Sequence, residues 1–351
     1  MTLRIAVIGD HGMHPDFFVA ALQRVVAPDT EFRTVELDWP STPMVQTYRP
    51  GQDPEHLKGL HEFLGEPEEI LRVTEGCQIF LTHIAPLSGA MLARLPDLRL
   101  IAISRGGPVN IDIAAARARG IPVINAPGRN ASAVAEFTVG LILSQTRNIA
   151  RAHVDLRNGN WRGDLYRIDL VGDELCEMTV GIIGYSHIGR RVAQLLRPFG
   201  CRILACDPYV ELSEADHAAG ILKADLNALL EASDVVSLHA RVTPETRGLI
   251  GARQIARMKP RAYLINTARG ELVDYEALHE ALGSGRIAGA ALDTFDVEPL
   301  PASSPLLVLP NVTLTPHISG ASVKTVRYSA EMIAGEVDRF LRHEKLRHAC
   351  L

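Results

Sequence analysis

The stretch Thr179–Arg190, TVGIIGYSHIGR, decides the fold of this 351-residue chain. Its first five residues form an apolar run typical of a buried strand, and Gly184 marks a tight turn that leads into a helix opening near Gly189. Free amide groups and the helix dipole at such an N-terminus attract a pyrophosphate, and small residues let the ligand approach the backbone. The segment therefore predicts a dinucleotide-binding turn, with a strand-to-helix turn that binds no ligand as the competing interpretation.

Two nearby residues bear on that choice. Ser186 stands where the fingerprint G-x-G-x-x-G has its middle glycine, so it either pushes a cofactor outward or places its hydroxyl on a phosphate. Asp207 ends the next expected strand, 23 residues after Gly184, close to the usual position of the carboxylate that binds the adenosine ribose. This agreement favours the dinucleotide interpretation. Because a 2′-phosphate would meet the like charge of Asp207, the predicted cofactor is NAD.

Short β-rich apolar runs alternate with helical segments along most of the chain, which is typical of an α/β protein with parallel sheets. Downstream of residue 178 the expected strands are Thr179–Ile183, Arg202–Asp207, Val235–His239, Ala262–Asn266, Gly289–Asp293 and Val312–Leu314. Upstream they are Ile5–Ile8, Gln78–Thr82, Leu100–Ser104 and Pro122–Asn125, with a helix over Ile113–Arg119. The six-strand series suits a complete doubly wound dinucleotide domain, and the four-strand series indicates a second domain.

Three further segments bear on the organisation of the chain. Ala131–Gln145 is apolar on most sides and predicts a buried helix that connects domains or subunits. The segment from Gly320 to His343 is again helical and can fold back on the first domain. Trp39–Glu66 is rich in Pro, Gly, Gln and Asp, so it predicts a loop with one short helix outside the core.

Composition excludes several classes of protein. The formal net charge is −5, from 36 Lys and Arg against 41 Asp and Glu, so the basic excess typical of nucleic-acid binding is missing. No signal-peptide pattern and no run of roughly 18 to 20 apolar residues is present, so we expect a cytoplasmic protein without a membrane partner. The cysteines are odd in number, scattered and without a C-x-x-C pair, which predicts no disulfide, no metal site and a reducing compartment. They are Cys77, Cys176, Cys201, Cys206 and Cys350.

Ionisable residues follow three consecutive expected strands, at the edge where such folds bind ligands. Taken singly, each has an ordinary interpretation: Arg269 as a surface arginine paired with Glu271 or Asp274, Asp293–Pro299 as a solvated acidic loop, and His317 as a structural histidine. Together they are the groups that hydride chemistry on a 2-oxo acid requires. The arginine holds a carboxylate, and an acid orients the imidazole and stabilises its protonated form, which gives a proton to the carbonyl oxygen.

At this point the sequence resembles the D-isomer-specific 2-hydroxyacid dehydrogenases, which include D-3-phosphoglycerate, glyoxylate/hydroxypyruvate and D-lactate dehydrogenases. The resemblance covers about residues 76–340. It rests on Asn125-Ala126-Pro127 through Val134-Ala135-Glu136, the Gly184–Gly189 turn, Thr243–Ile250, Asn266–Asp274, Asp293–Pro299 and Pro316-His317. The family uses NAD to interconvert a D-2-hydroxy acid and its 2-oxo acid.

The resemblance implies a role for each site residue. Arg269 would bind the substrate carboxylate and carbonyl, Glu298 would pair with the histidine, and His317 would be the acid and base. Asp293 would also lie near the nicotinamide carboxamide. The residues that would bind NAD are Gly184, Ser186, His187, Ile188, Gly189, Asp207, Thr267, Asp293 and Gly320.

The family also implies a domain arrangement. Residues 1–127 and 320–351 would form a discontinuous, flavodoxin-like substrate domain around a Rossmann cofactor domain at 128–319, with the active site in the cleft. A homodimer would form through the Ala131–Gln145 region. The last helical segment ends at Leu341, and only ten residues follow it, so we expect no amino-acid-sensing domain. Within the Trp39–Glu66 loop, the candidates for contact with a polar substrate are Tyr48, Arg49, His56 and Lys58, although a peripheral loop is the simpler interpretation.

In the first domain, Arg105-Gly106-Gly107 follow an expected strand, and glycines there free backbone amides for a substrate carboxylate. Arg105 resembles the phosphoglycerate-dehydrogenase-like branch, where an arginine helps to hold an anionic substrate; the alternative is a structural pair with Asp112 or Asp97. Arg241 stands where the family usually has proline beside the adenosine, which bears on the choice between NAD and NADP. The competing functions are a corepressor-like sensor of dinucleotides and an NADPH-preferring glyoxylate/hydroxypyruvate reductase.

Overall fold

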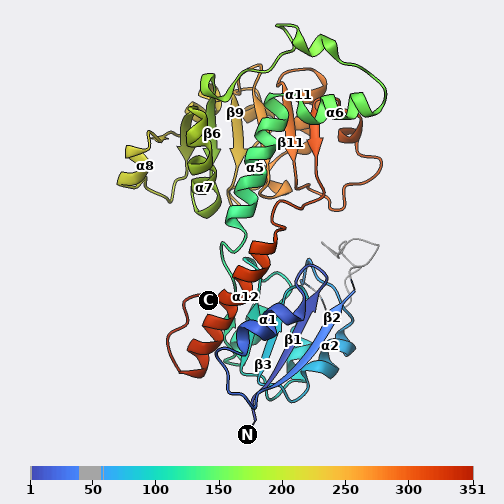
Figure 1. Ribbon diagram of the computed structural model, residues 1–351, viewed down its shortest axis with the longest axis vertical. Coiled ribbons are helices and arrows are strands. Elements are labelled where there is room, and N and C mark those ends of the chain that lie inside the picture. Colours follow the sequence, from blue (N-terminus) through green and yellow to red (C-terminus); the bar gives the residue numbers. More distant parts are fainter. Residues whose placement is uncertain (1, 39–56, 58, 351) are drawn as a thin grey trace. The chain divides into compact units, whose positions relative to one another are not determined.

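The computed structural model describes residues 2–38, 57 and 59–350. Tyr48, Arg49, His56 and Lys58 lie outside the described residues. The chain divides into two compact units, Met1–Arg129 with Ala321–Leu351 (unit 1) and Asn130–Gly320 (unit 2). Each unit is an α/β layer structure around one parallel sheet, so the predicted fold class is confirmed (Figure 1).

Unit 1 has a five-stranded parallel sheet in the order β2-β1-β3-β4-β5, the flavodoxin-like order. Its strands are β1 (Arg4–Asp10), β2 (Glu31–Leu37), β3 (Ile79–Thr82), β4 (Leu100–Ile103) and β5 (Val123–Ile124). Its helices are α1 (Pro15–Leu22), α2 (Pro67–Thr74), α3 (Gly89–Ala93), α4 (Ile113–Ala118) and α12 (Val323–Leu341). All strands point the same way, so their carboxyl ends meet at one edge of the sheet.

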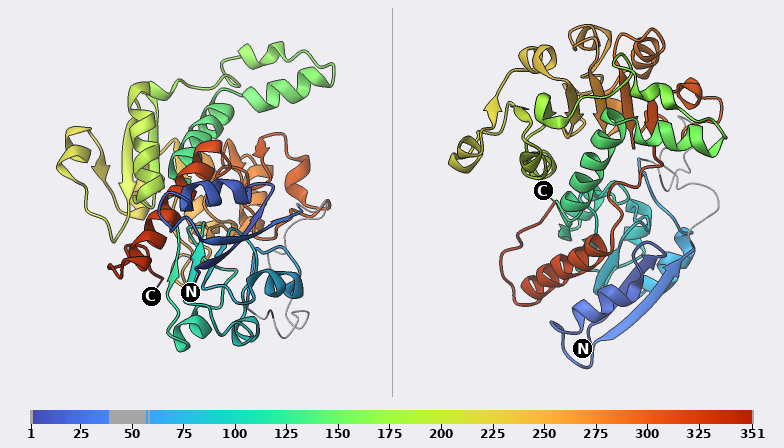
Figure 2. Two further views of the ribbon diagram at one scale, coloured as in Figure 1. Left: turned by 60° about the horizontal axis from the view of Figure 1, so that its bottom comes forward. Right: turned by 45° about the horizontal axis from the view of Figure 1, so that its top comes forward.

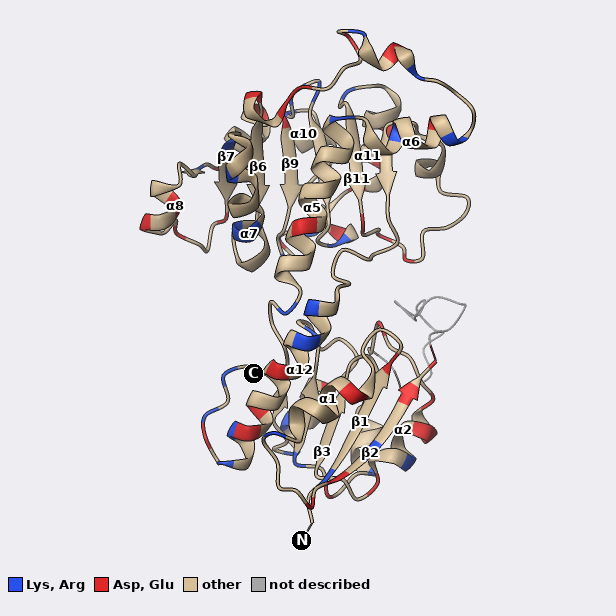
Figure 3. Cartoon of the chain, viewed as in Figure 1, with Lys and Arg blue, Asp and Glu red and all other residues tan. Residues whose placement is uncertain are grey.

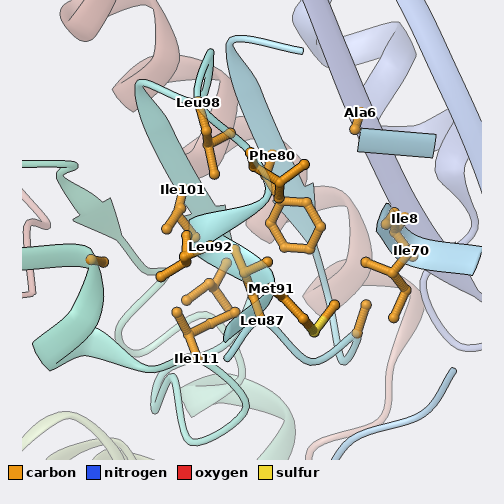
Figure 4. Close-up of a cluster of buried hydrophobic side chains, with 14 of the residues drawn as sticks. Ala6, Ile8, Ile70, Phe80, Leu87, Met91, Leu92, Leu98, Ile101 and Ile111 are labelled. Carbon is orange, nitrogen blue, oxygen red and sulfur yellow. The ribbon is translucent and has the colours of Figure 1, made fainter. Parts of the chain in front are cut away.

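Both faces of this sheet are covered, which is why its central strands read as unbroken apolar runs. Ala6 and Ile8 of β1 join the core beneath α2 and α3, together with Phe80 and Ile101 (Figure 4). The alternate residues Ile5 and Val7 join the opposite core, which includes side chains of α1 and α12. The C-terminal helix therefore folds back on unit 1, where it lies beside α1 (Figure 2).

Unit 2 has a seven-stranded parallel sheet in the order β12-β11-β10-β9-β6-β7-β8, which contains the doubly wound dinucleotide order with one added strand. Its strands are β6 (Thr179–Ile183), β7 (Arg202–Cys206), β8 (Leu222–Lys223), β9 (Val235–Leu238), β10 (Tyr263–Asn266), β11 (Gly289–Leu292) and β12 (Val312–Leu314). Its α-helices are α5 (Ala131–Thr146), α6 (Ile149–Arg157), α7 (His187–Leu196), α8 (Glu214–Ala218), α9 (Leu226–Ala232), α10 (Ala252–Ile255) and α11 (Tyr275–Gly283). Short 3₁₀ turns cover Gly163–Tyr166, Leu175–Glu177, Arg197–Phe199, Gly270–Leu272 and Pro305–Val308.

The ten expected strands are all present, with ends within two residues of the prediction, and two strands were missed. β2 is an edge strand whose sequence EFRTVEL mixes charged and polar residues with apolar ones, and β8 has only two residues. Neither provides the apolar run on which the prediction depended. Helix α7 begins at His187, two residues earlier than expected.

Helix α5 packs within unit 2, against α7, β10 and β11. Gln145 near its end donates a hydrogen bond from Nε2 to the carbonyl of Ala290 (2.6 Å) and another to Oγ1 of Thr313 (2.9 Å). Helix α6, in contrast, buries no residue. No helix in the described part of the chain is both long and apolar enough to cross a membrane. Acidic and basic residues are interspersed on both units (Figure 3).

Candidate active site

The turn after β6 has the geometry of an anion-binding loop. Gly184 has φ +90°, and a Cβ there would lie 2.5 Å from the amide nitrogen of Ala240. A Cβ on Gly189 would collide with the carbonyl of Gly184, so the first turn of α7 is pressed against the loop. The turn follows β6, which lies between β9 and β7 in the sheet. At this point the strand order reverses direction, and ligands bind there in such folds.

Ser186 and His187 are exposed at the start of α7, and the Ser186 side chain makes no capping hydrogen bond. Among the described residues, no hydrogen bond is recorded for the amides of Ser186, His187 and Ile188. Three free amides at the positive end of a ten-residue helix suit a pyrophosphate. The residues present therefore fit the phosphates of NAD, and the Ser186 hydroxyl is available to them.

Asp207 lies beside this turn, directly after β7. Its Oδ2 accepts a hydrogen bond from the amide of Tyr185 (2.8 Å) and its Oδ1 accepts one from the amide of Tyr209 (2.9 Å). The carboxylate is thus fixed in orientation while it stays partly exposed. A carboxylate held at this position suits the hydroxyls of an adenosine ribose and repels a 2′-phosphate.

The three ionisable residues of the sequence prediction follow the neighbouring strands β10, β11 and β12. Among them, Glu298 and His317 are in direct contact: Oε2 of Glu298 lies 2.7 Å from Nδ1 of His317. The other oxygen of Glu298 accepts a hydrogen bond from the amide of Phe295 (2.9 Å). Because a carboxylate only accepts, Nδ1 carries a proton and Nε2 is the nitrogen left for a substrate.

The backbone turn after β12 presents His317, which adopts the left-handed conformation with φ +53°. Asp293, fully buried after β11, holds that turn: Oδ1 accepts from the Thr315 hydroxyl (2.6 Å) and the Ile318 amide (2.9 Å), and Oδ2 accepts from the Ser319 amide (2.9 Å). Both carboxylate oxygens of Asp293 are therefore engaged within the protein. Its role toward the nicotinamide stays a prediction.

Arg269 is exposed after β10, and in the described structure it pairs with neither Glu271 nor Asp274. Its Nη1 donates only to the carbonyl of Ala268 (2.9 Å). A Cβ on the next residue, Gly270, would collide with the backbone of Phe295. The backbone next to Arg269 therefore packs closely against the loop that carries Glu298. The guanidinium of Arg269 remains available for an anion.

Two other predicted cofactor residues, Thr267 and Gly320, lie close to residues of α5 or its N-cap. Thr267 is buried, and its hydroxyl lies 2.8 Å from that of Thr138. A Cβ on Gly320 would lie 2.8 Å from the side-chain amide of Asn130, so Gly320 approaches that side chain closely.

In unit 1, the loop after β4 exposes Gly106 and Gly107, and no hydrogen bond from their amides is recorded among the described residues. Arg105 forms an ion pair with Glu62 and donates from Nη1 to the Glu62 carbonyl (3.0 Å). The suggested structural partners were wrong: Asp112 instead caps α4 through the Ala115 amide (2.8 Å), and Asp97 has no recorded contact with Arg105.

The NAD-binding-domain model of the D-isomer specific 2-hydroxyacid dehydrogenases matches residues 139–319, which is more than half of the chain. The chain belongs to this family. The predictions of the family, of an oxidoreductase acting on 2-hydroxy acids and of NAD as cofactor are thereby confirmed.

Similar proteins span several activities of the 2-hydroxyacid dehydrogenase family. Glyoxylate reductase of Korarchaeum cryptofilum is 39% identical over 276 residues, which cover 78% of this chain and 83% of that protein. D-3-phosphoglycerate dehydrogenase of Methanocaldococcus jannaschii is 39% identical over 278 residues, covering 79% of this chain but only 52% of the relative. Among solved structures, a putative family member from a Polaromonas species has TM-score 0.80 and 26% identity, with full coverage of both chains.

One group of polar residues in this family member was missed by the sequence analysis. Asp10, His83 and Arg129 come together at the carboxyl edge of the unit 1 sheet. Asp10 ends β1, His83 directly follows β3, and Arg129 lies five residues after β5. The rule that singled out the residues after β10, β11 and β12, applied to the first half of the chain, would have pointed to Asp10 and His83.

Proposed function

We propose that the protein uses NAD to interconvert a D-2-hydroxy acid and its 2-oxo acid, with His317 as the acid and base. The observation that carries this proposal is the 2.7 Å contact between Glu298 and His317 on the sheet edge that also bears Arg269. The names of similar proteins, glyoxylate reductase, hydroxypyruvate reductase and D-3-phosphoglycerate dehydrogenase, support a small 2-oxo acid as the substrate.

Each residue has a defined task in this mechanism. The fork of Arg269 binds the substrate carboxylate and polarises the adjacent carbonyl. In reduction, protonated His317 gives the proton on Nε2 to the carbonyl oxygen, while Glu298 holds Nδ1 and stabilises the imidazolium. In oxidation, neutral Nε2 takes the proton of the 2-hydroxyl group. When bound, the oxidised cofactor would supply the hydride acceptor for C2, and the reduced cofactor would supply the hydride donor for the reverse reaction.

The two units divide these tasks. We assign the cofactor to unit 2, through the turn Gly184–Gly189, and part of the substrate to unit 1, through the free amides of Gly106 and Gly107. Arg105 is less available to a substrate than expected, because Glu62 neutralises it. The predicted domain boundaries and the placement of the substrate in a cleft stay predictions.

We also propose that the chain acts as a homodimer in the cytoplasm. The segment that follows α5 supports the dimer, because its large apolar side chains are exposed: Trp161 by 84%, Tyr166 by 95% and Ile168 by 86%. Clustered exposed apolar residues mark protein interfaces. Since α5 is largely packed within unit 2, the contact would be made by residues 149–168 more than by the Ala131–Gln145 helix.

Steady-state oxidation of NADH with a panel of 2-oxo acids tests the reaction. We expect turnover by the wild type and a loss of about 100-fold or more in kcat in His317→Ala, the range of general acid catalysis. Arg269→Ala raises KM and lowers kcat together. The matched controls are His217→Ala and Arg253→Ala, at exposed positions on α8 and α10, and they keep wild-type kinetics. Absence of turnover on every acid, or full activity of both site variants, contradicts the proposal.

A further inference from the structure

A single peptide group of unit 2 links Tyr275 to the pair of Glu298 and His317. The Tyr275 hydroxyl donates a hydrogen bond to the carbonyl of Thr294 (2.5 Å). The amide of the same peptide group belongs to Phe295, and it donates to Oε1 of Glu298 (2.9 Å). The other carboxylate oxygen of Glu298 lies 2.7 Å from Nδ1 of His317. A continuous chain of hydrogen bonds therefore runs from α11, through the loop after β11, to the turn after β12.

The peptide group couples the two ends of this chain of hydrogen bonds because it is rigid. A peptide unit is planar, so the direction of its N–H is fixed once its C=O is held. The hydroxyl that holds the carbonyl of Thr294 thereby sets the direction from which the Phe295 amide meets Glu298. A hydrogen bond to the carbonyl also polarises the amide, and such cooperativity strengthens each bond by roughly 10–30%. The position and the hydrogen bonding of the Glu298 carboxylate thus depend on Tyr275.

Tyr275 is itself held in place at the start of α11. Asp274 caps the helix by accepting hydrogen bonds from the amides of Glu276 (3.1 Å) and Ala277 (3.1 Å). The half-buried ring of Tyr275 lies against the ring of Phe295, with 6.4 Å between centroids and a tilt of 50°. The helix cap and the ring contact together place the hydroxyl, so little conformational freedom remains to be lost when it binds the carbonyl.

The Tyr275 hydroxyl can act only as the donor in this contact. A carbonyl oxygen has no proton to give, so the phenol must supply it. Burial raises the pKa of Tyr275, and the negative charges of Asp296 and Glu298 raise it further. The phenol therefore keeps its proton throughout the neutral pH range, and its hydrogen bond to Thr294 persists.

We propose that Tyr275 is a positioning residue of the reaction, which holds Glu298 against Nδ1 of His317 through the peptide group between Thr294 and Phe295. This inference rests on the proposed function, in which Glu298 orients His317 as the acid and base. Tyr275 acts on the reaction through Glu298, so its contribution is lost when Glu298 no longer carries a charge.

Tyr275→Phe removes the hydroxyl and keeps the ring. We expect kcat to fall about three- to tenfold, as for the loss of one hydrogen bond, while KM for NADH changes less than about twofold. Tyr263→Phe is the matched control, because this tyrosine of β10 is also half-buried and no hydrogen bond of its hydroxyl is recorded among the described residues. The control keeps wild-type kinetics. An unchanged kcat in Tyr275→Phe overturns the inference.

A double-mutant cycle distinguishes positioning from a merely structural role. If Tyr275 acts through the charge of Glu298, then Tyr275→Phe lowers kcat by less than about twofold when it is added to Glu298→Gln. A structural residue would instead cause the same fold loss in both backgrounds. Losses that multiply in the double variant therefore reject the positioning role.

Nuclear magnetic resonance separates this inference from the proposed function, because it needs no turnover. Proton–nitrogen spectra of the full chain with ¹⁵N-labelled histidine follow the Nδ1 proton of His317, whose signal is assigned by its loss in His317→Ala. We expect this proton to exchange with water about threefold faster or more in Tyr275→Phe, and at the wild-type rate in Tyr263→Phe. Such an increase supports the role of Tyr275 even if no 2-oxo acid is reduced. An unchanged exchange rate rejects it, even if 2-oxo acids are reduced.

Discussion

The carboxylate of Glu298 lies 2.7 Å from Nδ1 of His317, and the two residues follow different strands, β11 and β12. Their contact depends on a turn in which His317 has φ +53° and which Asp293 holds through two backbone amides. Left-handed residues other than glycine are held in place by their surroundings and are frequent at functional sites. Asp293 is thus the structural support of the pair that we propose as catalytic.

Glu298→Gln tests the orienting role of this carboxylate. The amide keeps the shape of the side chain but not its charge, so we expect kcat to fall by roughly 10- to 100-fold while KM for NADH is unchanged. Glu280→Gln, at an exposed position of α11, serves as the control for loss of one surface carboxylate. Steady-state kinetics with the best 2-oxo acid provide the measurement. An unchanged kcat in Glu298→Gln would show that His317 does not depend on the charge of Glu298 for catalysis.

Cofactor choice is tested at Asp207, whose carboxylate is fixed by the amides of Tyr185 and Tyr209. We expect Asp207→Ala to raise KM for NADH by about tenfold and to improve the use of NADPH, because a ribose contact and a repulsive charge are removed together. Glu214→Gln, at an exposed position of α8, is the charge control. If the ratio of kcat/KM for NADH and NADPH stays the same in Asp207→Ala, the carboxylate does not select the cofactor.

The sequence was sufficient to predict those strands and site residues that depend on a local pattern of residues. The strands of unit 2 and the residues that follow them could be predicted, because each buried strand is an apolar run with a motif at its end. The partner of Arg105 could not, because Glu62 lies 43 residues away. Likewise, Asp10 and His83 are 73 residues apart, and only the pairing of β1 with β3 brings them together.

Close backbone packing at Gly270 leads to a prediction about stability. A Cβ there would collide with the backbone of Phe295, so we expect Gly270→Ala to lower the free energy of unfolding by about 2 kcal/mol or more. Gly283→Ala is the matched control, because no atom lies within 4 Å of its added Cβ at the end of α11, and it is neutral or stabilising by up to about 1 kcal/mol. Urea unfolding of the two variants measures the difference, and equal stabilities would contradict the packing argument.

A partly buried histidine predicts how stability depends on pH. Burial lowers the pKa of His239 from 6.5 to about 3, and its Nδ1 has no hydrogen-bond partner in the described structure. Below pH 6.5 the unfolded chain binds a proton that the folded chain does not, so stability falls with decreasing pH by up to about 1.4 kcal/mol per unit until pH 3. Urea unfolding from pH 7 to 4 measures this slope. We expect His239→Asn to be less stable at pH 7 and to have a shallower slope, and an identical slope would contradict the assignment.

The exposed apolar residues after α5 predict the effect of charge on self-association. Trp161 and Ile168 are exposed by 84% and 86%, so a dimer that buries them is disrupted when both become glutamate, because each partner then places like charges in an apolar contact. We expect the double variant Trp161→Glu, Ile168→Glu to sediment as a monomer where the wild type sediments as a dimer. Tyr209→Glu changes an equally exposed side chain, by 87%, outside this segment and leaves the dimer intact. If the double variant sediments as a dimer, the dimer interface does not include Trp161 and Ile168.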